Sequence, residues 1–177
     1  MNPDLSNLET AYEGLLAAAV SSGSETPAAP ESGGSSCPAP ARFAPRIRRA
    51  KLDREGYHLE VQIRPEQVVE AARIADRFGF SIDAVTGVDW IQEEAMEVVY
   101  DFHHRLLGWR LVIRTRVPRQ QPELPSIHEI FPGANWHERE THEFFGIRFL
   151  GHPNLTPLLL PEDATYHPLR KDFQGAA

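Results

Sequence analysis

The residues best suited to chemistry lie in the run HERETH, from His137 to His142. Zinc hydrolases place two histidines four residues apart on a helix, so that both imidazoles face one metal ion. Here the separation is five residues, which turns the two rings about 140° apart around a helix axis. We therefore expect polar residues of a short helix rather than a metal centre.

The other ionisable residues have simpler interpretations. The remaining histidines stand at positions 58, 103, 104, 128, 152 and 167, without regular ligand spacing. Glu138, Glu140 and Glu143 belong to the same short helix, in which Arg139 and Glu143 have the spacing of an i,i+4 ion pair. A stand-alone metal-dependent or paired-carboxylate hydrolase is one alternative. The sequence has no phosphate-binding loop, dinucleotide fingerprint or serine nucleophile motif.

Two basic stretches raise the alternative of a small nucleic-acid-binding adaptor. One consists of Arg46, Arg48, Arg49 and Lys51, and the other of Arg110, Arg114 and Arg116. Proteins that bind single-stranded nucleic acid interleave such charges with aromatic side chains for stacking, and these stretches do not. The net charge of −7 also argues against a general nucleic-acid binder. A docking surface for an acidic partner is the favoured interpretation.

Length and composition exclude further classes. A chain of 177 residues can bury one core but not two large domains. The single cysteine, Cys37, cannot by itself form a disulfide, an iron–sulfur cluster or a cysteine-rich zinc site. The apolar stretch from Leu15 to Val20 is much shorter than the roughly 20 residues of a membrane helix. No basic signal-peptide region precedes it, so we expect a cytoplasmic protein.

The pattern of apolar residues divides the chain into four parts. Residues 1–20 predict an amphipathic helix, and residues 21–45, rich in Ser, Gly, Pro and Ala, a flexible linker. Residues 46–150 predict a folded domain. Residues 151–177 carry four prolines and predict an irregular, extended C-terminal arm. A helix on such a linker must dock on this domain or on a partner.

Within the domain, strands and helices alternate. The pattern predicts a half-buried strand at 59–64, a helix from Pro65 to Gly79, a strand at 80–90, a hairpin of strands at 96–103 and 109–117, and a short helix that Asn135 begins and Gly146 ends. Glu138 has the position of a capping-box partner for Asn135. This order predicts an α+β two-layer sandwich with a mixed, mostly antiparallel sheet.

The last third of the chain resembles a known family. The runs ERETHEFFGIRF, GHPNLTPLLLPED and HPLRKDF, between Trp136 and Phe173, resemble the 30 kDa, or C-type, subunit of respiratory complex I and its equivalent in energy-converting membrane-bound NiFe hydrogenases. Three places depart from the complex I pattern. Glu143 replaces an Asp, Thr156 and Pro157 replace an Arg pair, and residues 164–166 replace Trp-Glu-Gly. These departures favour the hydrogenase branch.

The resemblance implies a non-catalytic structural and assembly subunit of a membrane-anchored oxidoreductase, in which electron transfer is coupled to ion translocation. It implies no catalytic, cofactor-binding or metal-binding residue in this chain, with iron–sulfur clusters and a NiFe or quinone site in partner subunits. Those partners would be the large 49 kDa or hydrogenase-like subunit and the small iron–sulfur subunit. The chain would bind no nucleic acid and would lie peripherally on the cytoplasmic side of the inner membrane, reaching the membrane only through other subunits.

The resemblance also assigns residues to partner docking. They are Glu138, Arg139, Glu140, Glu143, His152, Pro153, His167, Arg170, Lys171 and Asp172. We expect the arm to be loosely held in the isolated subunit. Arg170 is the leading candidate, because a guanidinium can hold a partner carboxylate through two parallel hydrogen bonds. The alternative is that Arg170 pairs within its own chain.

Overall fold

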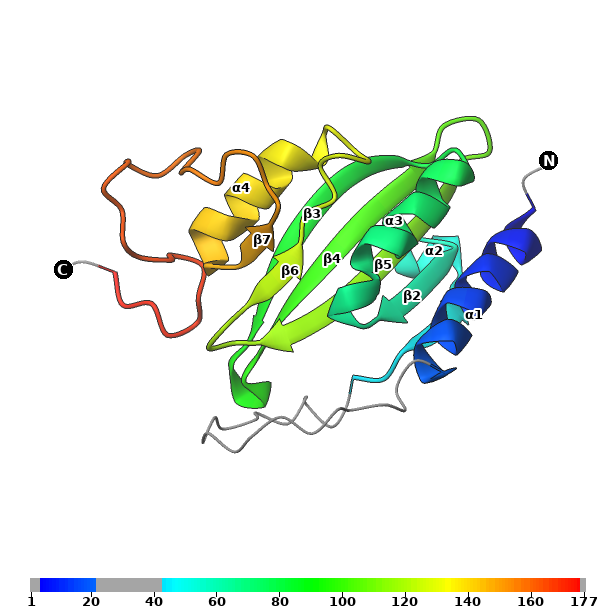
Figure 1. Ribbon diagram of the computed structural model, residues 1–177, viewed down its shortest axis with the longest axis horizontal. Helices are drawn as coiled ribbons and strands as arrows, with labels where there is room; N and C mark the ends of the chain where they lie inside the picture. The colour runs from blue at the N-terminus through cyan, green and yellow to red at the C-terminus, as the bar shows by residue number, and fades with distance from the viewer. Residues whose placement is uncertain (1–3, 22–42, 176–177) are drawn as a thin grey trace.

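The computed structural model describes residues 4–21 and 43–175 (Figure 1). Residues 22–42 of the predicted linker lie outside the described residues. The elements in chain order are α1 (Leu5–Ser21), β1 (Arg46–Arg49), α2 (Leu52–Glu55), β2 (Leu59–Ile63), the 3-10 turn η1 (Pro65–Gln67), α3 (Val68–Arg77), β3 (Ser81–Trp90), the 3-10 turn η2 (Ile91–Glu93), β4 (Ala95–His104), β5 (Trp109–Pro118), β6 (Glu123–Pro125), α4 (Ala134–Phe145) and β7 (Arg148–Leu150).

Five strands form a mixed sheet in the order β1-β2-β5-β4-β3. Strands β3, β4 and β5 make an antiparallel meander, whereas β2 pairs with β5 in parallel. The parallel pair follows from the helix α3 between β2 and the meander, since a parallel connection needs a crossover. A short parallel pair, β6 and β7, forms a second sheet. The predicted α+β fold with a mixed sheet is confirmed.

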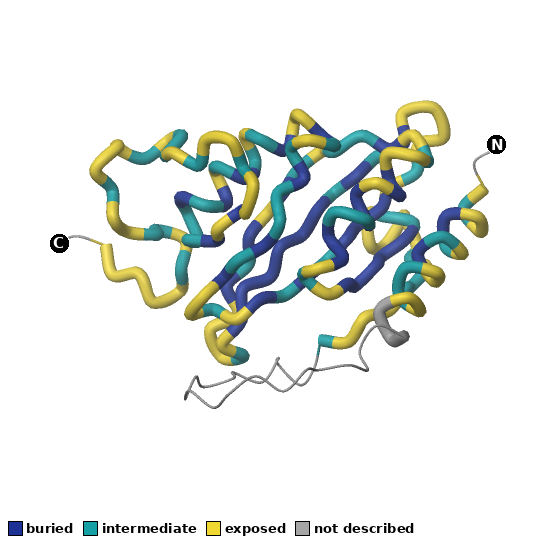
Figure 2. Tube along the Cα trace, in the orientation of Figure 1, coloured by how far each residue is buried: buried dark blue, intermediate teal, exposed yellow. Residues whose placement is uncertain are grey.

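The core lies between the sheet and the helices on one of its faces (Figure 1). Small and branched residues on α3, including Val68, Ala71 and Ala75, allow it to lie close to the sheet. Figure 2 shows the buried stretch running along β2, β4 and β5. The inward positions of each strand supply this core, as period-two patterning predicts.

The N-terminal helix α1 docks on this domain. Leu8 and Tyr12 are fully buried. The Tyr12 hydroxyl donates to the carbonyl oxygen of Ala71 at 3.1 Å, and Arg49 pairs with Glu9 at 2.5 Å. The choice between docking on this domain and on a partner is therefore decided for α1, which packs on α3 and β1.

Strand β2 is wholly buried, so the prediction of a half-buried strand is wrong. Glu60 is only 4% exposed, because Arg48 and Tyr57 lie over its carboxylate at 2.7 and 2.6 Å. Burial alone would raise the pKa of Glu60, but hydrogen bonds from Tyr57, Arg48 and Gln62 lower it to about 2. Glu60 can therefore be buried in β2 because other polar side chains satisfy its carboxylate.

Helix α4 begins one residue before the predicted cap. Gly133 rather than Asn135 precedes its first residue, and the side chain of Glu138 points into the core instead of back to the helix start. Both capping predictions are wrong. Gly146 ends the helix with φ of 75°, as predicted for a left-handed glycine cap.

Residues 151–175, here called the C-terminal segment, contain no helix or strand. They do not form a separate extended arm. The segment instead folds back along α4 (Figure 1) and is held there by hydrogen bonds to its own chain. These contacts argue against the expectation of a loosely held arm, which hydrogen exchange of the free chain can test.

Candidate docking surface

Glu143 of α4 holds the middle of the C-terminal segment. Its buried carboxylate accepts hydrogen bonds from the backbone N–H groups of Leu158 at 2.7 Å, Leu159 at 3.0 Å and Leu160 at 3.2 Å. Three successive amides with no ladder of their own thereby find an acceptor. The predicted ion pair between Glu143 and Arg139 is absent among the described contacts.

Arg139, one helical turn before Glu143 on α4, contacts the same segment. It donates to the carbonyl oxygens of Thr156 at 2.9 Å and Pro157 at 2.8 Å. Its guanidinium also lies over the Trp136 ring, 5.3 Å from the centroid. The two residues that depart from the complex I pattern, Thr156 and Pro157, thus contribute backbone oxygens to a contact within the chain.

A second attachment lies at the C-terminal end of α4. His167 Nδ1 donates to the carbonyl oxygen of Glu143 at 2.8 Å, and Arg170 Nε donates to that of Phe145 at 2.6 Å. Both side chains lie against Gly146, where a Cβ would be 2.5 Å from Arg170 and 2.6 Å from His167. Burial and the neighbouring Arg119 lower the pKa of Arg170. Arg170 thus contacts its own chain through Nε. Its two amino groups have no hydrogen-bond acceptor among the described residues.

A third attachment joins the segment to the sheet. Asp89, buried on β3, makes two hydrogen bonds with Arg119, at 2.8 and 3.0 Å, and accepts the backbone N–H of Lys171 at 2.9 Å. Asp172 pairs with Arg119 at 2.5 Å. Burial alone would raise the pKa of Asp89, but these partners lower it. Sequence reasoning missed Asp89 and Arg119, although an acidic residue at an inward position of a strand was a detectable signal.

Glu138 lies on the inner side of α4 and is fully buried. Its carboxylate accepts the backbone N–H of Ile127 at 2.8 Å and the hydroxyl of Ser126. Burial raises the pKa of Glu138 to about 7, and these two hydrogen bonds act in the opposite direction. Ser126 also lies 3.1 Å from His128 Nδ1, so a short polar chain leads outward from the buried carboxyl.

The predicted docking residues lie in three kinds of environment. Glu138, Glu143 and His167 are used inside the chain. Glu140, Pro153 and Lys171 are exposed. His152 is half-buried, and its Nε2 donates to the carbonyl oxygen of Asn135 at 3.1 Å.

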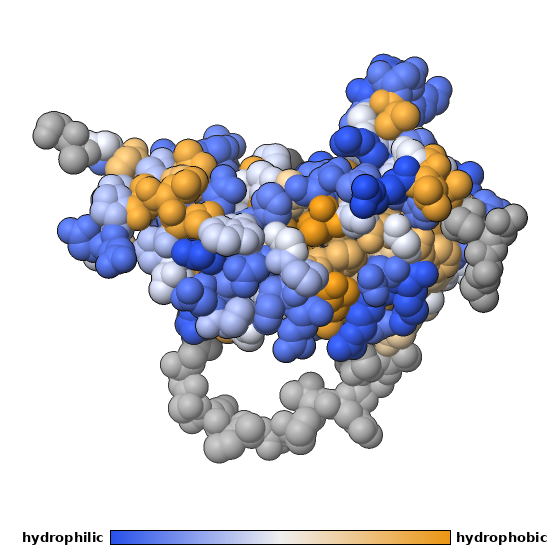
Figure 3. All heavy atoms as spheres, turned by 90° about the horizontal axis from the view of Figure 1, so that it is seen from above, coloured by the Kyte–Doolittle hydropathy of each residue, from blue (hydrophilic) through white to orange (hydrophobic). Residues whose placement is uncertain are grey.

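Exposed apolar residues concentrate around the C-terminal segment. Six of the eleven large apolar side chains that are exposed among the described residues lie here, namely Trp136, Leu150, Leu159, Tyr166, Leu169 and Phe173. We call these six residues the C-terminal face. Figure 3 shows apolar atoms gathered at this end of the molecule. A hollow of about 350 Å³ between β3 and α4 adjoins it and is lined by Leu169, Phe144 and Glu140 among others. Apolar surface that is held in place and left open to solvent is typical of a protein interface.

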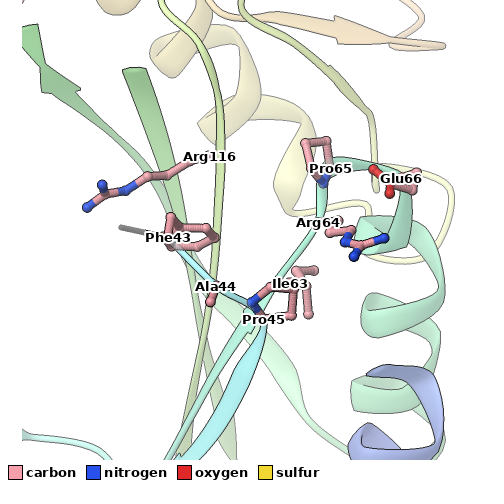
Figure 4. Close-up of a pocket in the computed structure, with 8 residues that line it drawn as sticks. All are labelled: Phe43, Ala44, Pro45, Ile63, Arg64, Pro65, Glu66 and Arg116. Carbon is pink, nitrogen blue, oxygen red and sulfur yellow. The ribbon is translucent and has the colours of Figure 1, made fainter. Parts of the chain in front are cut away.

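A second hollow, of about 430 Å³, lies near the start of the domain (Figure 4). Phe43, Pro45 and Pro65 give it apolar walls. The guanidinium groups of Arg64 and Arg116 point away from each other in Figure 4, so they do not converge on a ligand. This hollow therefore has the lining of a surface depression rather than of a catalytic pocket.

The contacts disfavour the two alternative functions. His142 Nδ1 donates to the carbonyl oxygen of Ile147 at 2.9 Å, and residues 4–21 and 43–175 contain no group of three or more His, Cys, Asp or Glu that could hold a metal. Much of the basic charge is paired within the chain. Arg48 pairs with Glu55 and Glu60, Arg49 with Glu9, and Arg114 and Arg116 with Glu97. Little of it is left for a nucleic acid.

Comparison with known proteins gives one consistent result. The family described as "Respiratory-chain NADH dehydrogenase, 30 Kd subunit" matches residues 61–177. The C subunit of the NADH-quinone oxidoreductase of Roseiflexus castenholzii is 42% identical over 120 residues, which cover 64% of this chain and 68% of the relative. The C/D subunit of the NADH-quinone oxidoreductase of Phocaeicola vulgatus is 43% identical over 91 residues, 51% of this chain and 17% of the relative.

A solved structure agrees with the sequence matches. One chain of the membrane-bound sulfane sulfur reductase, an archaeal respiratory membrane complex, has a TM-score of 0.65 and 27% identity, over 76% of this chain and 79% of that chain. In the part of this chain that the structure describes, no helix is long and apolar enough to cross a membrane. The chain therefore belongs to the family of the 30 kDa subunit of respiratory-chain NADH dehydrogenase, the C-type subunit of complex I-like respiratory oxidoreductases.

Proposed function

We propose that this chain is a non-catalytic structural and assembly subunit that docks through its C-terminal face onto the large, D-type subunit of a membrane-bound respiratory oxidoreductase. The observation that carries the proposal is the C-terminal face itself. Its six apolar side chains are exposed. The segment beneath most of them is fixed by Glu143, Arg170 and Asp89. A surface that is already ordered loses less conformational entropy on binding.

The relatives support the choice of partner. In the Phocaeicola relative the C and D subunits bear one name, C/D, as a single protein. A D-type subunit is therefore the partner expected for a separate C-type subunit. The small iron–sulfur subunit is proposed as a second neighbour from the family resemblance, with all redox centres in the partners. A peripheral position on the cytoplasmic side of the inner membrane completes the proposal.

The branch of the family is also part of the proposal. Glu143, Thr156 and Pro157 favoured the hydrogenase branch. The relatives named above are NADH-quinone oxidoreductase subunits, whereas the solved structure is that of a sulfane sulfur reductase and favours no quinone. We therefore favour a respiratory dehydrogenase, in which electrons pass through neighbouring subunits to a quinone.

The docking residues have two roles in this proposal. Exposed groups contact the partner directly: Glu140, Pro153, Lys171 and the free amino groups of Arg170. Glu143 and His167 act by holding the segment in position. Arg170 thus serves both roles, because among the described residues its side chain donates only through Nε.

Co-purification with the affinity-tagged large subunit tests the proposal. Leu159→Glu and Leu169→Glu each place a charge on the C-terminal face, and we expect either to reduce recovery of the complex at least about tenfold, since an unpaired charge is costly to bury. The matched control is Leu106→Glu. Leu106 is 92% exposed at the β4–β5 hairpin tip, at the other end of the molecule (Figure 1). Equal recovery of all three variants and the native chain would overturn the proposal.

A further inference from the structure

The carboxyl of Glu138 is enclosed without a cationic partner. No lysine or arginine of the described chain pairs with it, and its two acceptor contacts come from Ile127 and Ser126. From β4 below, the buried hydroxyl of Tyr100 faces the same region and has no hydrogen-bond partner among the described residues. Burial raises the pKa of Tyr100 as well, so that the phenol stays neutral. Glu138 is therefore the group in this cluster that can change charge.

Ser126 connects Glu138 to the outside through His128. Its hydroxyl oxygen accepts the backbone N–H of His128 at 3.2 Å and lies 3.1 Å from His128 Nδ1. The His128 ring lies 5.7 Å from the ring of His152. His128 Nε2 has no hydrogen-bond partner among the described residues. This hydrogen-bond chain thus runs from the buried carboxyl of Glu138 to a ring nitrogen, His128 Nε2, without such a partner.

Which groups donate and which accept in this hydrogen-bond chain depends on whether Glu138 carries a proton. When Glu138 is ionised it can only accept, so the single hydroxyl proton of Ser126 points to Glu138. His128 Nδ1 must then carry a proton and donate to Ser126. When Glu138 is protonated, it donates to Ser126, and Ser126 donates to His128 Nδ1, which must be unprotonated. The neutral ring then carries its proton on Nε2.

We propose that Glu138, Ser126 and His128 form a proton-linked switch that decides which ring nitrogen of His128 carries hydrogen beside the docking surface. The protons balance in one relay. A proton from solvent binds Nε2, the Nδ1 proton passes to Ser126, and the serine proton passes to Glu138. The ring stays neutral and the carboxylate becomes an acid. The contacts from Ile127 and the His128 backbone are the same in both states, so no heavy atom has to move.

The surroundings place the switch near neutral pH. Burial raises the pKa of Glu138 to about 7, so both states are populated there. Besides Tyr100, the ionisable groups near this cluster include Arg139, His152 and His142, and burial lowers the pKa of the two histidines. Their ring nitrogens donate to the carbonyl oxygens of Asn135 and Ile147. Each thus has a fixed hydrogen bond outside the relay.

The consequence for docking rests on the proposed function. His128 adjoins His152, which is bonded to the first turn of α4, the turn that also carries Trp136 of the C-terminal face. A partner would meet a hydrogen-bond donor at His128 Nε2 when Glu138 is protonated and an acceptor when it is ionised. Association with the large subunit should then depend on pH through Glu138.

Nuclear magnetic resonance of ring nitrogens in the full chain tests the switch directly. With ¹⁵N-labelled histidine, we expect the neutral ring of His128 to change from the Nε2–H to the Nδ1–H form between about pH 5.5 and pH 8.5. Its midpoint should coincide with the carboxyl titration of Glu138. His58 is the internal control, because its Nδ1 accepts the backbone N–H of Arg110 at 3.0 Å, so its neutral ring should keep the Nε2–H form. A single His128 tautomer across the Glu138 titration would overturn the proposal.

Two variants separate the relay from a general effect on structure. In Glu138→Gln the amide can donate to Ser126 permanently, so the neutral ring of His128 should always have the Nε2–H form. In Ser126→Ala the tautomer of His128 should no longer follow Glu138. A switch that persists in Ser126→Ala contradicts the relay even if the Gln variant does not fold. These spectra need no partner. Failure of the native chain to bind the large subunit would therefore overturn the docking role and leave the switch standing.

Discussion

Glu143 and Asp89 are buried carboxylates that bind backbone N–H groups of one segment. Charged acceptors form stronger hydrogen bonds than neutral ones, so each holds the chain more tightly than an amide would. Their type was visible in the sequence, but their partners were not. Glu143 was expected to pair with Arg139, because local spacing favours that pair, whereas both residues bind the segment that returns over α4.

We predict that Glu143→Gln lowers the free energy of unfolding by about 2–3 kcal/mol, because charge-assisted hydrogen bonds to three amides are replaced by weaker ones. The matched control is Glu140→Gln on the exposed side of the same helix, which should change stability by less than about 0.5 kcal/mol. Urea denaturation of both variants measures the difference. Equal midpoints would show that Glu143 does not hold the segment.

Glu138 predicts a pH dependence of stability with an unusual sign for a carboxyl group. Its pKa is raised from 4.5 to about 7 in the folded chain, so between these values the folded state binds the proton that the unfolded state has released. The stabilisation that this bound proton gives the folded chain is fully present below pH 4.5. As the pH rises to about 7, the free energy of unfolding falls by roughly 3 kcal/mol.

In Glu138→Gln this loss should vanish. The variant should therefore gain stability relative to the native chain as the pH rises from about 5 to about 8. Unfolding curves at both pH values measure the change. Parallel pH profiles for the two proteins would contradict the burial of an unpaired carboxyl.

At the scale of elements, the end of α4 is the most constrained position. Gly146 has φ of 75°, and a Cβ there would meet Arg170 and His167 at 2.5 and 2.6 Å. We predict that Gly146→Ala lowers stability by about 2–4 kcal/mol, from backbone strain together with displacement of the segment. Gly151 is the matched control, with φ of 83° and nothing near its Cβ position. Gly151→Ala should cost only about 1 kcal/mol. Thermal unfolding distinguishes the two, and equal losses would contradict this account.

The same scale shows where sequence patterns suffice. Alternation of apolar residues located β2, β4 and β5, and Gly146 correctly marked the end of α4, because these signals are local. The start of α4 was misplaced. Phe131 accepts the backbone N–H of Ala134 in the turn before the helix, so the helix starts without the Asn135 side chain. The buried Glu60 depends on partners from β1 and the following loop, which no period within one strand reveals.

The folded C-terminal segment lay beyond local patterns for the same reason. Prolines correctly excluded regular structure there, but the acceptors that order it, Glu143 and Asp89, lie far away in the sequence or in another element. The motif resemblance singled out Glu143, His167 and Arg170 but not Asp89 or Arg119. It did not show that Glu138, Glu143 and His167 face their own chain.

At the scale of the whole molecule, the C-terminal face and the β4–β5 hairpin lie at opposite ends (Figure 1). The docked helix α1 lies near the hairpin end, away from the C-terminal segment (Figure 1). We propose that the C-terminal end of the molecule contacts the partner, and the sheet connects this end to the rest. This arrangement is consistent with the proposed structural role.

Hydrogen–deuterium exchange of the chain, alone and in the assembled complex, tests the central claim most directly. Amides of residues 158–160 and 171 should already exchange slowly in the free chain, because Glu143 and Asp89 accept them. On assembly, protection should increase across residues 136–173 and stay unchanged at the β4–β5 hairpin tip. Fast exchange of these amides in the free chain, or protection on assembly confined to the hairpin end, would contradict an ordered C-terminal face that docks on the large subunit.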